Sequence, residues 1–291
     1  MPQDLTPLAG ELQAYMTHLR REEKSANTLS KYGRDIRRFV AFFLQVTKGQ
    51  ARGPSGALAL TKEITLAYKE SLCAAYTAAS VNSMLAAVNG FLTFLDLGNL
   101  RIKQLRIQRR AFCDQGEELS RAEYDRALDA AGAGRLSLAL QTICATGIRV
   151  SELRHITAAA VRAGTAHVQC KGKARQIFIP ADLRRVLLAY MAREKLTAGS
   201  VFLTRSGRPL NRSNIWRDMK RLAKAAGVPP KKLFPHNLRR LFARLYYSMT
   251  KDIARLSDIL GHSDGSVTRI YIMTSGREHA RQLNKMKLVR L

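Results

Sequence analysis

The stretch from Arg101 to Ser120, RIKQLRIQRRAFCDQGEELS, limits what this chain can fold into, because it divides the sequence in two. Five basic residues precede a turn, and Ser120 stands three residues before Glu123, the capping-box pattern of a helix start. A chain of 291 residues is long enough for two domains. The predicted units are a helical domain over 1–105, a basic linker over 106–118 and a second domain over 119–291.

Residues 25–46, SANTLSKYGRDIRRFVAFFLQV, carry apolar side chains with the period of an amphipathic helix. Either Ser25 or Asn27 could cap this helix. Two more helices are predicted, over residues 61–76 and over residues 80–99, where Gly98-Asn99 is the stop. The apolar stripe of the first helix consists of Tyr32, Ile36, Phe39, Val40 and Phe43.

The opposite face of the 25–46 helix is basic. Such a face suits a helix that lies on phosphate groups, although a solvated basic face is an alternative reading. Its members are Lys31, Arg34, Arg37 and Arg38.

The sequence of the second part, residues 119–291, predicts a mainly helical domain with one β-hairpin. Residues 166–180, AHVQCKGKARQIFIP, alternate in hydrophobicity on both sides of a Lys-Gly-Lys turn. The expected fold class is therefore mainly α, with an all-α first domain and an α+β second domain. Helices are predicted over residues 120–131, 135–145, 150–156, 181–194, 211–226, 236–248 and 251–260.

The charge of the chain indicates a polyanionic partner. There are 49 lysines and arginines against 22 acidic residues, a formal net charge of +27. Residues 1–110 contain 16 basic and 8 acidic side chains, so the excess is present in both parts. A generally basic or ribosome-associated protein is the alternative that charge alone leaves open.

The cysteines and the N-terminus exclude other classes. The four cysteines form no C-x-x-C pair and have no histidines at metal-ligand spacing, which argues against a disulfide framework and structural zinc. The N-terminus lacks a signal-peptide pattern, and no apolar run approaches 18 residues. We therefore expect a soluble intracellular protein, in the cytoplasm with the nucleoid.

Three short segments carry residues suited to chemistry. In CATGIRVSELRHI, Arg149 precedes Glu152 by three residues, so a carboxylate could hold the arginine while its fork faces a phosphate. In FPHNLRRLFARLYY, His236 and Arg239 share one helix face after a starting proline. The hairpin turn holds two lysines, Lys171 and Lys173. Each segment alone is more simply read as surface structure.

Together the segments fit attack on a DNA phosphodiester. Guanidinium groups stay charged and can stabilise the non-bridging oxygens, and a lysine or histidine can protonate a leaving oxygen. A tyrosine with a pKa of about 10 needs nearby cations and a proton acceptor to act as a nucleophile. The stretch GHSDGSVTRIY supplies a candidate, because it places Tyr271 nine residues after His262.

The ordered set ATGIRVSEL, the lysine hairpin, HNLRR, LGHSD and the following tyrosine resembles the tyrosine recombinase, or phage integrase, family, and is closest to its short two-domain Xer-like members. The resemblance covers residues 120–275. The first part is similar, more weakly, to the SAM-like core-binding domain of the family through SANTLSKYGRDIRRF. This similarity marks as DNA-binding candidates Asn27, Thr28, Lys31, Arg34 and Arg37.

The resemblance implies a role for each matched residue. Arg149 and Arg239 would bind the scissile phosphate, with Glu152 as the acidic residue behind them. Tyr271 would form a 3′-phosphotyrosyl link to DNA. Lys171 would donate a proton to the leaving 5′ oxygen. His236 would assist proton transfer, and His262 would donate a hydrogen bond to the phosphate. The hairpin is one residue shorter than the common K-G-x-K-x-R turn, so Lys173 stays open as the acid.

The family also implies how the reaction is organised. The covalent link stores the energy of the phosphodiester bond, so no cofactor, metal or ATP is needed for rejoining. Strands would be exchanged through a Holliday junction by a tetramer on double-stranded DNA with inverted-repeat core sites. A C-terminal segment containing Leu283, Met286 and Leu288 would pack on a neighbouring subunit or on its own domain.

Several functions remain open from the sequence. No extra N-terminal domain for distant arm sites is expected before the helical half, which favours a simple two-domain recombinase over an integrase that needs long attachment sites. We expect the integrase or excisionase of a mobile element. An Xer-like resolvase of chromosome or plasmid dimers is the alternative. A type IB topoisomerase-like activity and a DNA-binding regulator without catalysis fit the matched residues less well.

Overall fold

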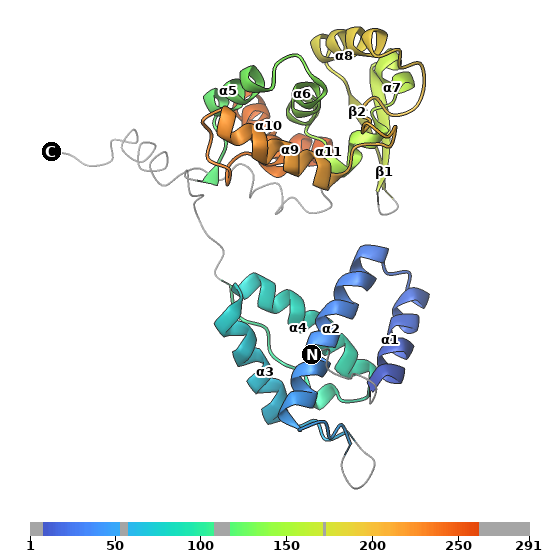
Figure 1. Cartoon of the computed structure of the whole chain (residues 1–291), viewed down its shortest axis with the longest axis vertical. Helices are drawn as coiled ribbons and strands as arrows, with labels where there is room; N and C mark the ends of the chain where they lie inside the picture. The colour runs from blue at the N-terminus through green and yellow to red at the C-terminus, as the bar shows by residue number, and fades with distance from the viewer. Residues whose placement is uncertain (1–7, 53–57, 108–116, 171–172, 262–291) are drawn as a thin grey trace, which may run out of the picture. The chain divides into compact units, whose positions relative to one another are not determined.

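The computed structural model describes residues 8–52, 58–107, 117–170 and 173–261. The chain forms two compact units, residues 1–109 and 110–291. The predicted fold class is confirmed, because the described residues are mainly helical and contain one two-stranded sheet (Figure 1). None of the described helices is both long and apolar enough to cross a membrane.

The described residues of the first unit are mainly α-helical (Figure 1). Helices α2 and α4 pack against each other, α1 packs on α2, and α3 contacts both central helices. Their apolar faces form the core around Ile36, Phe43 and Leu85, which are almost fully buried. The elements are α1 (Ala9–Arg21), α2 (Ala26–Val46), α3 (Lys62–Ala75), α4 (Ala78–Phe94) and the short 3₁₀ helix η2 (Gly98–Leu100).

The predicted helix over residues 25–46 is confirmed as α2. Ser25 is its N-cap, and its hydroxyl accepts a hydrogen bond from the backbone N–H of Thr28 at 3.2 Å. The helix predicted from residue 80 begins earlier, at Ala78, and ends at Phe94, because the turn before Gly98 already leaves helical geometry.

Two asparagines of α4 fix the chain that leaves the first unit. Asn89 exchanges two 2.8 Å hydrogen bonds with the backbone of Ile102, and Asn82 does the same with Leu105 at 2.7 and 2.8 Å. These side chains satisfy backbone groups of an extended segment that has no strand partner. The segment 101–105 is therefore held along α4 as part of this unit.

The second unit surrounds the buried helix α6, which contacts α5, α8 and α10 (Figure 1). Leu140 and Ile143 of α6 are fully buried at its centre. The capping box predicted at Ser120 is confirmed at the start of α5. The helices are α5 (Arg121–Ala131), α6 (Arg135–Thr146), α7 (Ala158–Ala163), α8 (Ala181–Arg193), α9 (Arg212–Ala225), α10 (Pro235–Thr250) and α11 (Ile253–Leu260).

The predicted hairpin is confirmed. Strand β1 (Thr165–Cys170) pairs antiparallel with β2 (Lys173–Phe178), with Val168 opposite Arg175. Ile177 and Ile179 are buried, whereas Phe178 between them is 71% exposed, so the strand alternates as the sequence indicates.

The helix predicted over residues 150–156 is present, but it is not an α-helix. Residues Val150–His155 form a 3₁₀ helix, η4. Gly147 ends α6 in the left-handed conformation with φ +65°, and a Cβ there would lie 2.5 Å from the ring of Phe242. The segment after this tight turn is short and fixed by Arg149 and Glu152 at its start, which favours the tighter 3₁₀ winding.

Candidate active site

Four of the predicted site residues lie in the described part of the second unit, at the start of η4 and on α10. They are Arg149, Glu152, His236 and Arg239. Lys171, His262 and Tyr271 lie outside the described residues, as does the C-terminal segment with Leu283, Met286 and Leu288.

Arg239 is a buried arginine, 2% exposed, in the first half of α10. Pro235 occupies the first turn of this helix, where its missing N–H costs nothing. The two terminal nitrogens of Arg239 donate to the carbonyls of Gly147 at 2.6 Å and Leu260 at 2.7 Å. The side chain thus joins the end of α6 to the end of α11, and its orientation is fixed by the fold.

Arg149 and Glu152 form a reciprocal pair at the start of η4. The backbone N–H of Arg149 donates to Glu152 Oε2 at 2.7 Å, and Arg149 Nη1 donates to Oε1 at 3.0 Å. Glu152 is 4% exposed, whereas the side chain of Arg149 is 39% exposed. The predicted local pair is therefore present, and the exposed part of the guanidinium can meet a ligand.

The Glu152 carboxylate stays ionised in spite of its burial. Burial raises its pKa, but the hydrogen bond from the Arg149 backbone and the positive charges of Arg175 and Arg149 outweigh that effect and hold the pKa below its ordinary value. A charged acceptor is thus available to both guanidinium groups at neutral pH.

His236 lies in the first turn of α10, with part of its surface exposed. Loss of hydration on the buried side of the ring and the positive charges around it lower the pKa of His236 to about 4. The neutral imidazole can accept a proton at pH 7. The nearby charges are those of Arg240, Arg239, Arg149 and Arg212.

We expect His236 to titrate well below the ordinary histidine range in DNA-free protein. The unfolded chain binds a proton near pH 6.5 but the folded chain only near pH 4, so this group removes stability as pH falls between those values. NMR of the imidazole signals should show no His236 midpoint between pH 5.5 and 8. The decrease in the free energy of unfolding from pH 6.5 to pH 4 should be smaller in His236→Gln than in the wild type. An NMR midpoint near pH 6.5 for His236 would contradict the lowered pKa.

Sequence reasoning missed Arg175, which belongs to the same cluster. Its Nη2 donates to Glu152 Oε2 at 2.5 Å, and its Nη1 donates to the carbonyl of Ile259. A signal was present, because Arg175 stands two residues before the buried Ile177 and therefore on the same, core-facing side of β2. An arginine at a core-facing strand position needs a charged or carbonyl partner.

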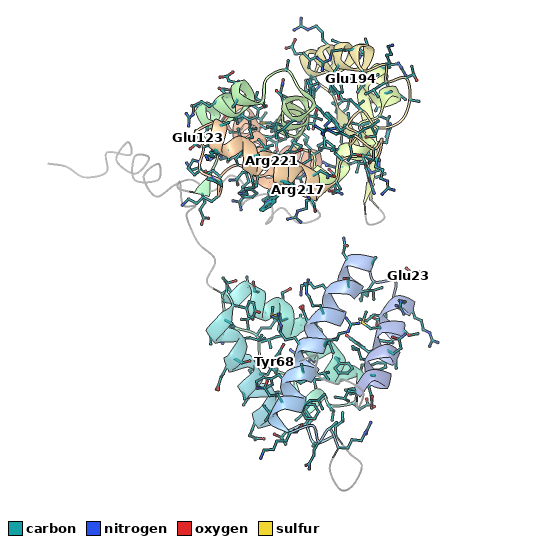
Figure 2. All side chains as sticks on the ribbon, in the orientation of Figure 1. Glu23, Tyr68, Glu123, Glu194, Arg217 and Arg221 are labelled. Atoms are coloured by element: carbon teal, nitrogen blue, oxygen red, sulfur yellow. The ribbon has the colours of Figure 1, made fainter. Side chains whose placement is uncertain are left out.

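A basic surface follows α9 near His236. Arg217 and Arg221, labelled on this helix in Figure 2, are exposed, and so is Trp216. Lys220 Nζ lies 5.4 Å from the centroid of the Trp216 ring. Arg212 at the start of the helix is also exposed and contributes to the positive charge at His236. This mixture of cations and an aromatic ring suits contact with a nucleic-acid backbone.

In the first unit, the candidate DNA-binding residues divide into two groups on α2. Asn27, Arg34 and Arg37 are exposed, and Thr28 is partly buried. Lys31 instead reaches inward, with Nζ 2.6 Å from Asp35 Oδ2 and 3.1 Å from the carbonyl of Ser83. The Lys31 ammonium group is therefore bound to a buried carboxylate, that of Asp35.

We expect Lys31→Ala to lower stability and Arg37→Ala to lower DNA affinity. Removing Lys31 leaves Asp35, whose side chain is 4% exposed, with one partner fewer, at a cost of about 1–2 kcal/mol. Arg37→Ala should leave urea denaturation unchanged and reduce the salt dependence of DNA binding by about one counterion. Equal loss of DNA affinity in both variants, with unchanged stability, would make Lys31 a phosphate contact.

Among the described residues, no group of three or more histidine, cysteine, aspartate or glutamate side chains is placed to hold a metal ion.

The sequence matches two family profiles. The Phage integrase family matches residues 117–277, more than half of the chain, and this range includes Lys171, His262 and Tyr271. The Phage integrase N-terminal SAM-like domain matches residues 12–97.

Known relatives and structures agree with these profiles. The tyrosine recombinase XerD of Halalkalibacterium halodurans is 29% identical over 280 residues, which cover 89% of this chain and 91% of the relative. A lambda integrase (75–356) dimer bound to a core site has a TM-score of 0.71 at 20% identity, covering 92% of this chain and 96% of that one. A lambda integrase tetramer bound to a Holliday junction has a TM-score of 0.69 at 20% identity, covering 91% and 76%.

The structural likenesses establish the fold, and the match over residues 117–277 establishes the family. With an integrase profile over the second unit and a SAM-like profile over the first, this chain belongs to the phage integrase family of tyrosine recombinases.

Proposed function

We propose that the chain is a site-specific recombinase, which breaks and rejoins DNA through a covalent 3′-phosphotyrosyl intermediate. The observation that carries this proposal is the arginine pair: Arg149 and Arg239 both bind carbonyls at the end of α11, directly before the segment that leads to Tyr271. Two guanidinium groups at one place suit the two non-bridging oxygens of a phosphodiester.

In the proposed reaction, the phenolic oxygen of Tyr271 attacks the scissile phosphorus, and the bond from phosphorus to the 5′ oxygen breaks. Arg149 and Arg239 donate to the non-bridging oxygens as charge develops on them. His236 assists the transfer of the phenol proton, and Lys171 protonates the leaving 5′ oxygen.

The remaining roles complete the cycle. His262 hydrogen-bonds the phosphate, and Lys173 is the alternative to Lys171 as the acid. A 5′ hydroxyl from the partner strand then attacks the phosphotyrosine and releases Tyr271, so one phosphodiester is formed for each one broken. Neither a metal nor ATP enters this balance.

Double-stranded DNA is the proposed partner of both domains. The helical domain over residues 1–105, the basic linker over 106–118 and the catalytic domain over 119–291 would all contact the duplex. The exposed arginines of α2 and α9 support this reading. We propose that copies of the chain bind inverted-repeat core sites, that a tetramer exchanges the strands through a Holliday junction, and that this takes place on DNA in the cytoplasm.

Two biological roles suit this chemistry. The integrase or excisionase of a mobile element is the first. The similarity to XerD over most of the chain favours, as a second candidate, resolution of chromosome or plasmid dimers. Deletion of the gene separates them, because a dimer resolvase mutant accumulates unresolved multimers, whereas an integrase mutant leaves its element immobile.

Covalent capture tests the proposed reaction without knowledge of the site. The protein is incubated with fragmented DNA of the source organism, denatured with detergent, and the DNA that remains attached is sequenced. We expect fragments that share one inverted-repeat core and carry a free 5′ hydroxyl at the break. Attachment at unrelated sequences, with relaxation of any supercoiled plasmid, would favour a topoisomerase-like activity. No attachment under any condition would refute cleavage by this chain.

A further inference from the structure

Three arginines meet the end of α11. The carbonyls of residues 259–261 are consecutive, and each accepts a hydrogen bond from a different guanidinium group. Arg175 Nη1 donates to Ile259, Arg239 Nη2 donates to Leu260 at 2.7 Å, and Arg149 Nη2 donates to Gly261 at 3.4 Å.

The end of a helix is suited to bind cations in this way. The last carbonyls of an α-helix have no partner within the helix and carry the negative end of the helix dipole. The three side chains come from β2, α10 and the start of η4, so the end of α11 brings together three separate elements.

Arg175 differs from Arg149 in what it can still reach. Its side chain is 13% exposed, against 39% for Arg149. One terminal nitrogen is bound to Ile259 and the other to Glu152 at 2.5 Å. Both ends of its fork are thus held by the protein, and one of them is tied to the Glu152 carboxylate by an ion pair.

Gly261 leaves the space that Arg175 needs. This residue ends α11 in the left-handed conformation with φ +63°, which glycine adopts without strain. A Cβ at this position would lie 2.7 Å from Cδ of Arg175. Any other residue here would therefore both strain the turn and displace Arg175.

We propose that Arg175 is a positioning residue, which acts on catalysis by holding Glu152 and the end of α11, and through them Arg149 and Arg239. The inference rests on the proposed recombinase function. With Arg175 in place, the Glu152 carboxylate is shared between two cations. Without Arg175, the whole negative charge of Glu152 acts on Arg149 and draws its fork away from the phosphate.

The test measures single-turnover DNA cleavage, with saturating protein on a duplex built from the sequence recovered by covalent capture. Arg175→Gln should cleave about 10–100-fold more slowly, because small displacements of a phosphate-binding group have effects of this size. DNA affinity should stay near that of the wild type. Arg175→Lys keeps the charge but cannot bridge Glu152 and Ile259, so it should show an intermediate loss.

Two readouts separate positioning from loss of folding. In the double variant Arg149→Lys with Arg175→Gln, the second change should slow cleavage by much less than Arg175→Gln does in the wild type, because both changes affect the interaction with Glu152. A methylphosphonate at the scissile position removes one negative oxygen, so the Arg175→Gln defect should shrink on that substrate. A general loss of folded protein would lower both rates equally.

Arg184 provides a matched control in the same unit. Its guanidinium binds the carbonyls of Val161 and Arg162 at the end of α7, a contact of the same kind at a helix that carries no site residue. Arg184→Gln should therefore cleave at the wild-type rate.

The inference would be overturned if Arg175→Gln cleaved DNA at the wild-type rate. It would also be overturned if the rate losses of Arg175→Gln and Arg149→Lys multiplied in the double variant. If Arg175→Gln does not fold, the same comparisons made with Arg175→Lys decide it. Failure of the wild-type protein to form any covalent complex would count against the recombinase function instead.

Discussion

Replacing Tyr271 with phenylalanine is expected to reduce the covalent protein–DNA complex by at least about 10⁴-fold, because the change removes the attacking oxygen and nothing else. DNA binding should stay within about twofold of the wild type, since one hydroxyl contributes little to an interface dominated by phosphate contacts. The measurement is detergent-resistant attachment to a nicked duplex of the recovered site, followed on a denaturing gel.

Tyr247→Phe is the matched control for this change. Tyr247 lies on α10 with its ring centroid 5.6 Å from Lys251 Nζ, and its phenylalanine variant likewise loses one phenolic hydroxyl. We expect Tyr247→Phe to form the covalent complex as the wild type does. Persistent attachment in Tyr271→Phe, or its loss in Tyr247→Phe, would assign the nucleophile to another residue.

Replacing Arg239 with alanine is expected to damage both catalysis and stability. Cleavage should fall by about 10³-fold, the effect of removing one donor to a developing charge in a preorganised site. The variant also leaves the buried carbonyls of Gly147 and Leu260 without this donor, which should lower the free energy of unfolding by about 2–4 kcal/mol. Cleavage must therefore be measured well below the unfolding temperature of the variant.

Arg244 separates the two effects of the Arg239 change. It lies on the same helix and binds Glu118 and the carbonyl of Leu119, at the start of the second unit. Arg244→Ala should lower stability while cleavage by the folded protein is retained. Equal losses of cleavage in Arg239→Ala and Arg244→Ala at matched folded fractions would mean that Arg239 acts only on stability.

The helices could be predicted where one local rule was sufficient. The α2 stripe has the period of an amphipathic helix, Ser25 supplies a cap, and Ser120 with Glu123 supplies a capping box, so each signal lies within a few residues of its effect. Over residues 150–156 a helix could be predicted but its 3₁₀ winding could not, because the tight turn at Gly147 and the packing of Phe242 decide the winding there.

The outward face of α2 could be predicted only in part. Arg34 and Arg37 are exposed as expected, but Lys31 turns to Asp35 and to the Ser83 carbonyl of α4. The partner in α4 is 52 residues away in sequence, so no pattern within α2 could indicate it.

The sequence by itself determined the chemistry that this protein can offer. The amino-acid sequence shows the net charge and the pairing of Arg149 with Glu152 three residues later. It also shows the order of the site residues, which is Arg149, His236, Arg239 and Tyr271. They suffice to indicate phosphoryl transfer on DNA, because residue types and short spacings specify which groups are available.

Only the tertiary structure decided how these groups are held. The arginines reach carbonyls that are 84, 92 and 112 residues away in the chain, for Arg175 with Ile259, Arg239 with Gly147 and Arg149 with Gly261. Such contacts depend on how α6, α10, β2 and α11 pack. Neither helix period nor strand alternation in the sequence indicates which residues this packing brings together. Strand alternation indicates that Arg175 faces the core, but its partners Glu152 and Ile259 follow only from the fold.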